Sequence, residues 1–267
     1  MTEARNPRAI RTRIWKEEPD PENPFAAARA YCHGYDVYGD MLGRATWAQM
    51  FHLLFRGEVP TPEQAALLDA LAVALTNPGP RDASVHAAMC GGACGSTAAA
   101  SLMAALAVGD GQLGGGREVF HAMQRWSEAG CDLAAWTASP RDAGGDVARV
   151  WKTLEHAPGH EPRSTAASPT VIRTLERLAG IGGGKSLAWL ATNRYALEEA
   201  AGCPLAMTGV AAAAFHDLGY SPPQGEMCFL LLRLPGAAAH AIEQAEFGHK
   251  QFPFYDIDLA EAGGQHV

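Results

Sequence analysis

Asp82 and His86 stand four positions apart where a helix is expected to begin. Residues at this spacing lie on one face of a helix, so the carboxylate can hold the imidazole in one orientation. A histidine fixed in this way can act as a general acid or base, which makes both residues candidate catalytic groups. The structural alternative is an aspartate that caps the helix beside a histidine that packs inside the protein.

Arg233 is a candidate for binding a carboxylate. Its planar guanidinium can grip a carboxylate through two parallel hydrogen bonds, for which lysine is a poor substitute. The alternative is an ion pair on the surface or one with a purely structural role.

A glycine-rich loop is the candidate anion site, and it consists of Gly182, Gly183, Gly184, Lys185 and Ser186. Consecutive glycine amides beside a lysine and a serine can form a nest for a phosphate. A Walker A loop is not predicted, because Ala179 replaces its first glycine and no strand precedes it. A flexible hinge is the alternative, and it is compatible with anion binding.

The six cysteines are too few for a disulfide scaffold in 267 residues, which favours a reducing cytoplasm. His86, Cys90 and Cys94 share a helix face, but a fourth ligand is missing and their small neighbours favour close packing instead. We therefore expect no metal.

Bulk composition disfavours a nucleic-acid or membrane partner. The net charge is -8 and the basic residues are scattered, whereas nucleic-acid binding requires a basic patch. No run approaches the about 18 apolar residues that a membrane helix needs. Residues 1–13 carry four arginines with no apolar segment behind them, so we expect no signal peptide and a cytoplasmic protein.

The elements that position these residues read as helices almost throughout, so the predicted fold class is all-α with minor strands. Thr61, Pro62 and Gln64 form a helix start with a capping box. Residues 82–108, rich in Ala, Gly, Ser and Cys, are predicted to be one closely packed helix, followed by a loop at 109–116. Further helices are expected at 117–129, 144–156, 169–179, 187–201, 208–218, 223–233 and 235–246, and 157–168 is expected to be a mobile loop. His216 and Asp217, at the end of one helix, are expected to face solvent.

Several motifs occur together in an order that resembles citrate synthases and citryl-CoA lyases. Residues 33–37 and 46–61 resemble "RGYdi … sFeEvayLLl.GelPt", and Arg233 to Gly236, with His240 and Gln244, resembles "GRvPG…aHa.Eq". Four shorter segments resemble "DHGpt.pS.laAR", "LaiGD.HGGA", "pGiGHrvhk" and "NvDG": 77–88, 106–116, 179–186 and 206–209. The similarity covers about residues 30–128 and 175–258.

The chain departs from this family at its usual catalytic positions. The histidines of "DHG" and "HGGA" are replaced by Pro78 and Leu113, and the aspartate of "NvDG" by Thr208. The histidine and arginine of "GHr" correspond to Gly183 and Gly184. Arg233, at a position that grips substrate carboxylates in relatives, is kept.

The resemblance implies the all-α citrate-synthase fold, with a large helical domain at 1–115 and 205–267 and a smaller lobe at 116–204. It also implies a homodimer with 82–108 near the interface, and a cleft that closes over a coenzyme A thioester and a small carboxylic acid. In that cleft Arg233 and His33 would meet substrate, His86, Asp82 and His240 would move protons, and 182–186 would hold a phosphate of CoA.

Two functions follow from the resemblance. The first is an enzyme of the citryl-CoA lyase or citrate synthase type that makes or cleaves a C–C bond α to a CoA thioester, with altered substrate or chemistry. The alternative is a non-catalytic relative that binds CoA or serves as the partner of a paralogous subunit.

Overall fold

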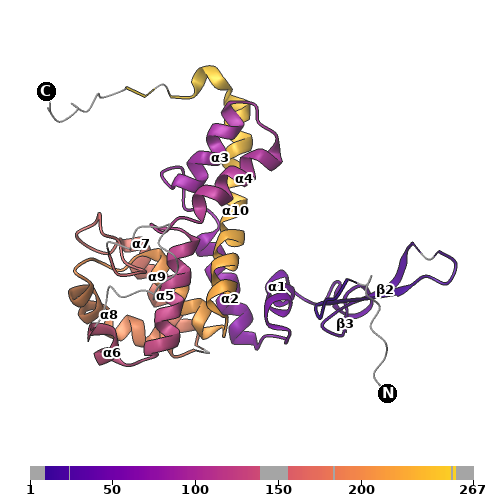
Figure 1. Cartoon of the computed structure of the whole chain (residues 1–267), viewed down its shortest axis with the longest axis horizontal. Helices are drawn as coiled ribbons and strands as arrows, with labels where there is room; N and C mark the ends of the chain where they lie inside the picture. The colour runs from indigo at the N-terminus through magenta and orange to yellow at the C-terminus, as the bar shows by residue number, and fades with distance from the viewer. Residues whose placement is uncertain (1–9, 24, 139–155, 183, 254, 257–267) are drawn as a thin grey trace, which may run out of the picture. The chain divides into compact units, whose positions relative to one another are not determined.

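The computed structural model describes residues 10–23, 25–138, 156–182, 184–253 and 255–256 (Figure 1). Helices dominate the described part, which confirms the predicted all-α class. Contacts divide the chain into two units: unit 1 comprises Met1–Thr76 and Asp110–Leu232, and unit 2 comprises Asn77–Gly109 and Arg233–Val267. These boundaries differ from those of the expected lobes, which stay a prediction.

Unit 1 begins with a small antiparallel sheet, the minor strand content that the sequence predicted. Its order is β1 (Trp15–Pro19), β2 (Ala27–Cys32) and β3 (Tyr35–Asp36), with an irregularity between Glu18 and Pro19. The β2–β3 turn is made by His33 and Gly34, both with positive φ. A short π-helix, η1 (Val37–Met41), follows the sheet.

Two capping boxes start the next helices, α1 (Trp47–Arg56) and α2 (Pro62–Leu75). Thr46 with Gln49, and Thr61 with Gln64, exchange side-chain and backbone hydrogen bonds at the two N-termini. The second box is the one the sequence predicted. The buried face of α2 is also the predicted one: Leu67, Leu68, Leu71 and Leu75.

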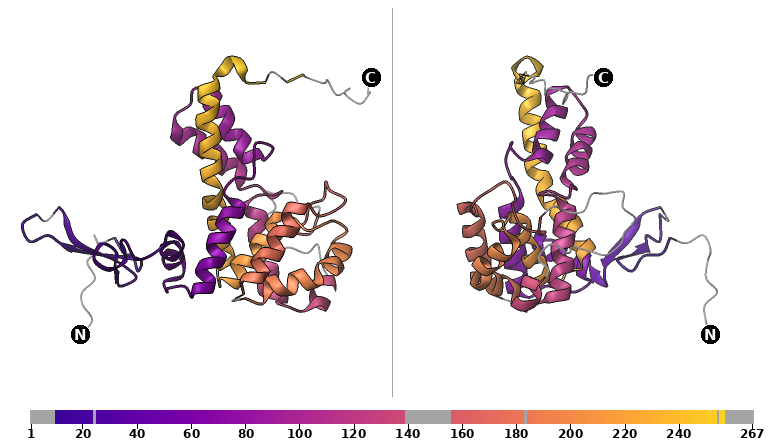
Figure 2. Two further views of the ribbon diagram at one scale, coloured as in Figure 1. Left: turned by 180° about the vertical axis from the view of Figure 1, so that it is seen from behind. Right: turned by 60° about the vertical axis from the view of Figure 1, so that its left-hand side comes forward.

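The centre of unit 1 is α9 (Met207–Asp217), whose residues Val210–Phe215 are fully buried. A helix that is apolar on every side must be surrounded by other elements. Contacts to α9 come from α2, α5 (Gly116–Ala129), α7 (Pro169–Ile181) and α8 (Ser186–Ala201) (Figure 2). A short helix, α6 (Leu133–Ala138), contacts α5 and α8.

Unit 2 corrects the prediction of one helix at 82–108. The segment forms α3 (Ala83–Ala93) and α4 (Ala98–Gly109), because Gly95 adopts a left-handed conformation that cannot continue a helix. Both helices pack against the second half of α10 (Pro222–Phe247). The expected close approach is present: a Cβ on Gly92 would lie 2.0 Å from the carbonyl oxygen of Ala241.

The two helices predicted at 223–233 and 235–246 are one, α10, with Pro235 inside it. A proline removes one backbone donor and usually bends or ends a helix, but α10 continues through Pro235. A short 3-10 helix, η2 (His249–Gln251), follows.

Two sequence predictions need separate mention. Most of the helix expected at 144–156 lies outside the described residues. The loop at 157–168, expected to be mobile, is anchored at its start, where Ala157 and His160 are buried. Across the described residues, no helix has both the length and the apolarity to cross a membrane.

Candidate functional site

Asp82 and Arg233 come together in unit 2. One oxygen of Asp82 accepts hydrogen bonds from the amides of Ser84 and Val85 at the start of α3, and the other pairs with the guanidinium of Arg233. Arg233 is 7% exposed, and burial lowers its pKa although Asp82 opposes this. This geometry matches the structural roles that the sequence left open for both residues, and their roles toward substrate stay predictions.

The two other candidate proton carriers of unit 2 have aromatic or acidic neighbours. The ring of His86 lies 6.1 Å from that of Phe252 and 6.2 Å from that of Tyr255, between centroids. His240 Nδ1 lies 3.4 Å from a carboxylate oxygen of Glu243. His240 Nε2 is buried and has no hydrogen-bond partner among the described residues.

His33 lies in unit 1, in the turn after β2. It is the one described non-glycine residue with a positive φ, at 48°. A Cβ on Gly57, at the end of α1, would lie 3.1 Å from His33 Nδ1, so the imidazole packs against the backbone there. Its exposure to a cleft stays a prediction.

The glycine-rich loop is partly filled by the chain itself. The carboxylate of Asp217 accepts hydrogen bonds from the amides of Ser186 and Leu187, at 2.7 and 2.9 Å. A Cβ on Gly184 would overlap the same carboxylate, which requires glycine there. Phosphate binding by Gly182, Gly184, Lys185 and Ser186 stays a prediction, and Gly183 lies outside the described residues.

The prediction that His216 and Asp217 face solvent is wrong. His216 Nδ1 lies 2.8 Å from Ser186 Oγ, and its ring stacks on Trp126 at 5.5 Å between centroids. Partial burial lowers the pKa of His216. Helix α8 begins beside the end of α9, where Asp217 accepts from its first amides and His216 contacts the Ser186 hydroxyl.

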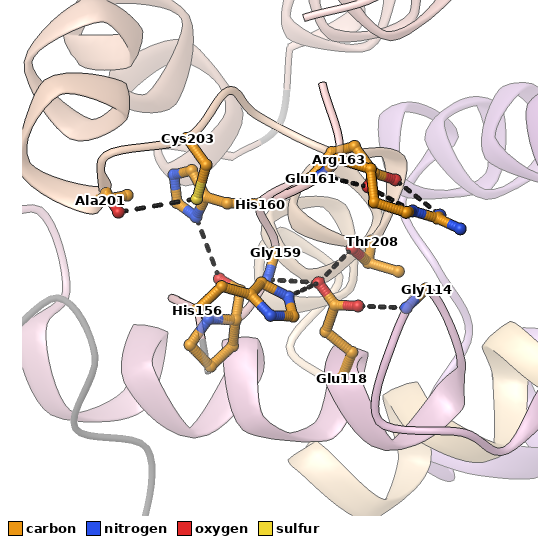
Figure 3. A network of polar contacts seen from close by, with 11 residues as sticks. Gly114, Glu118, His156, Gly159, His160, Glu161, Arg163, Ala201, Cys203 and Thr208 are labelled. Carbon is orange, nitrogen blue, oxygen red and sulfur yellow. Dashed lines mark hydrogen bonds and ion pairs between the residues drawn. The ribbon is translucent and has the colours of Figure 1, made fainter. Parts of the chain in front are cut away.

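A buried carboxylate, Glu118 on α5, is the centre of a polar cluster that sequence reasoning missed (Figure 3). Its side chain is 1% exposed. One oxygen accepts hydrogen bonds from the Gly159 amide at 2.9 Å and the Thr208 hydroxyl at 3.0 Å, and lies 3.6 Å from His156 Nε2. The other oxygen accepts from the Gly114 amide.

His160 lies in the same loop as Gly159 and is 6% exposed. Its Nδ1 lies 3.3 Å from the Pro158 carbonyl, which can only accept, so the imidazole N–H is assigned to Nδ1. The other nitrogen, Nε2, is buried and has no hydrogen-bond partner in the described part of the chain. Burial lowers the pKa of His160, which favours the neutral imidazole with its lone pair on Nε2.

Solved structures similar to this chain have a common fold. Citryl-CoA lyase from Hydrogenobacter thermophilus superposes with a TM-score of 0.72 at 18% identity, over 97% of this chain and 98% of the lyase. Citrate synthase from the thermophilic archaeon Thermoplasma acidophilum superposes with a TM-score of 0.54 at 19% identity, over 84% of this chain and 59% of the synthase. The chain has the citrate-synthase fold.

The same fold occurs within a larger protein. ATP citrate lyase from Methanothrix soehngenii, solved with citrate and coenzyme A, matches at a TM-score of 0.70 and 15% identity, over 99% of this chain but 44% of the lyase. No family profile matches the chain, and no curated protein matches it in sequence.

Within the citrate-synthase fold, the Glu118 cluster joins two segments that carry the resemblance. Gly114 lies in the segment similar to "HGGA", and Thr208 stands where "NvDG" has its aspartate. The third segment, Pro158-Gly159-His160, has the proline, glycine and histidine of "pGiGHrvhk" in a form two residues shorter, which is an alternative to the match at 179–186. That short match, and a glutamate on the apolar face of an amphipathic helix, were the available sequence signals.

Metal ligation was the remaining alternative for His86, Cys90 and Cys94. In the described ranges, no three His, Cys, Asp or Glu side chains lie close enough together to hold a metal ion. Cys94 is exposed and is the C-cap residue of α3, so it lies at the end of the helix that was expected to continue through it.

Proposed function

We propose that this chain makes or cleaves a C–C bond α to the carbonyl of a CoA thioester, with His160 as the group that exchanges a proton with the acid's hydroxyl. The observation that carries the proposal is the buried imidazole of His160, whose Nε2 has no hydrogen-bond partner among the described residues. It stands within a citrate-synthase fold that matches a citryl-CoA lyase over nearly the whole of both chains.

In the cleavage direction, a 3-hydroxyacyl-CoA must lose its hydroxyl proton as the C–C bond breaks. The electrons of that O–H bond form the carbonyl of a keto acid, and those of the C–C bond form the enolate of the shorter acyl-CoA. The enolate then takes up a proton at carbon. A neutral histidine with its lone pair on Nε2 is suited to accept the hydroxyl proton. Because His160 is 6% exposed, the substrate reaches it only when the surrounding chain moves.

Other residues supply binding in this proposal. Lys185 holds a phosphate of CoA, and the binding of a carboxylate by Arg233 remains a prediction. His86, Asp82, His240 and His33 remain candidates for contact with substrate. The homodimer and the cytoplasmic location also remain predictions.

Calorimetric titration with CoA and with acetyl-CoA tests the binding half of the proposal. We expect micromolar binding of both, and weaker binding by Lys185→Ala, with Arg173→Ala on the exposed face of α7 as the charge-matched control. If neither compound binds, the chain would share the fold of citryl-CoA lyase without its CoA site.

The second candidate function is a non-catalytic CoA-binding or partner subunit. It is favoured by Pro78, Leu113 and Thr208, which replace the usual catalytic side chains. Leu113 is 70% exposed and has no ionisable group. This function predicts that CoA binds but no acyl-CoA is turned over, and that a second, intact family member is retained when the protein is purified from its source.

A further inference from the structure

The Glu118 carboxylate binds three segments that lie far apart in the sequence. Its hydrogen-bond donors come from the loop before α5 (Gly114), from the loop that holds His160 (Gly159), and from the first turn of α9 (Thr208) (Figure 3). Side-chain atoms from α5 thus fix the backbone next to His160 directly.

The two oxygens of Glu118 are fully engaged. Three donors bond to them, and His156 Nε2 stands 3.6 Å from one of them. A carboxylate so buried and so fully bonded is poorly placed to take a proton from substrate. Its chemistry is that of a fixed acceptor.

We propose that Glu118 is a positioning residue, which holds the Gly159–His160 loop and Thr208 in register so that His160 can serve the reaction. This inference rests on the proposed function, because that function gives His160 its role in the reaction. The hydrogen bonds of Glu118 are independent of it.

Stability alone is a weak reason for a carboxylate here. Replacing a buried charge and its partners with apolar groups of similar volume is often neutral or stabilising. A carboxylate with several donors does supply what an apolar core does not, namely a defined geometry for each donor.

Glu118 also acts on the charge of His160. Burial lowers the pKa of His160, while the hydrogen bond to Pro158 and the negative charges of Glu118 and Glu198 raise it, and His156 lowers it. Removing the charge of Glu118 should therefore lower the pKa of His160 further. This shift reports that the charge of Glu118 lies near His160, whereas the hydrogen bond to Gly159 is tested by amide exchange.

Glu118→Gln is the first test, because it keeps the size of the side chain and removes its charge. Its amide group can accept on one side only, so either Gly114 or the pair Gly159 and Thr208 loses its acceptor. We expect amide hydrogen exchange in 110–116 and 156–162 to rise by at least tenfold, with exchange in α2 unchanged. Glu226→Gln, which loses a carboxylate bonded to Arg117 instead, is the control and should leave exchange in 156–162 unchanged.

Thr208 supplies a matched pair. Thr208→Ser keeps the hydroxyl donor, and Thr208→Val keeps the shape but removes it. We expect Thr208→Val to speed exchange in 156–162 and Thr208→Ser to leave it near that of the parent. Equal behaviour of the two variants would contradict the role of the hydrogen bond.

The readout for positioning is the state of His160. We expect the NMR titration of His160 in Glu118→Gln to move to lower pH, and the turnover of a CoA thioester to fall in kcat by about 10-fold or more with KM for CoA unchanged. An unmoved titration together with unchanged exchange would overturn the inference. If the parent protein turns over no CoA thioester while the exchange and the titration respond as described, the proposed function fails and the positioning role of Glu118 stands.

Discussion

Asp82 is a residue with two separable tasks, since one oxygen caps α3 and the other pairs with Arg233. Asparagine is as good an N-cap as aspartate but carries no charge. Asp82→Asn should therefore reduce the free energy of unfolding through the ion pair alone. The cost should stay below the about 3–5 kcal/mol of breaking a fully buried pair, since Asp82 is partly exposed.

Asp82→Ala removes the cap as well. Its free energy of unfolding should be lower than that of Asp82→Asn by about 1 kcal/mol, the usual value of such a cap. Urea denaturation of the two variants beside the parent measures the difference. Equal stability of the two variants would show that the cap contributes nothing.

Individual residues of the site could be predicted from the sequence, but their pairing could not. Asp82 and Arg233 were both identified from the sequence, yet 151 positions separate them and nothing local indicates that they pair. Glu118 was missed because a glutamate on a helix usually faces water, and its donors come from segments up to 90 positions away. The chemical character of each side chain could be predicted from the sequence, whereas the residues that it contacts depended on the fold.

At the scale of elements, starts of helices were easier to predict than their breaks. The capping box of Thr61 and Gln64 is a local pattern, and it forms as expected. The break between α3 and α4 depends on one glycine among several in an alanine-rich run, and Pro235 did not end α10. In neither place does the local pattern alone give the outcome, because glycine and proline are each compatible with a break or with a continuous helix.

The crossing of α3 and α10 in unit 2 depends on a missing side chain. In Gly92→Ala the new methyl group would overlap backbone atoms of Ala241, which cannot rotate away. We expect Gly92→Ala to lower the free energy of unfolding by about 1–3 kcal/mol, the usual cost of overpacking.

Gly180→Ala on α7 is the matched control for this crossing. A Cβ there meets no atom within 4 Å, and alanine is the better helix former. That variant should be as stable as the parent or more stable, as thermal unfolding can show. Similar stability of Gly92→Ala and Gly180→Ala would contradict the close approach.

At the scale of the whole molecule, four histidines share one electrostatic feature. Burial lowers the pKa of His52, His121, His160 and His216 below the ordinary value. Between about pH 6.5, the ordinary value, and the lowered pKa of each folded histidine, the unfolded chain binds protons that the folded chain does not. Stability must then rise with pH through this window and level off above it.

The expected result is a loss of stability as the pH falls from 7 to 5, measured by urea denaturation at several pH values. His160→Gln should weaken this dependence. Of the four histidines, only His52 is more deeply buried than His160. His249→Gln, on an exposed histidine, should leave the dependence unchanged. A flat profile for the parent would contradict the burial of these groups as neutral imidazoles.

The central claim is that a citrate-synthase fold performs C–C chemistry on a CoA thioester through His160. The most direct measurement is the release of acetyl-CoA from citryl-CoA by the parent protein and by His160→Gln, side by side at equal concentration and with folding checked by circular dichroism. We predict release by the parent, and a kcat lower by about 10²–10⁴-fold in the variant, the usual contribution of a general acid or base. Equal rates for the two proteins, or no release by a parent that binds CoA, would contradict the claim.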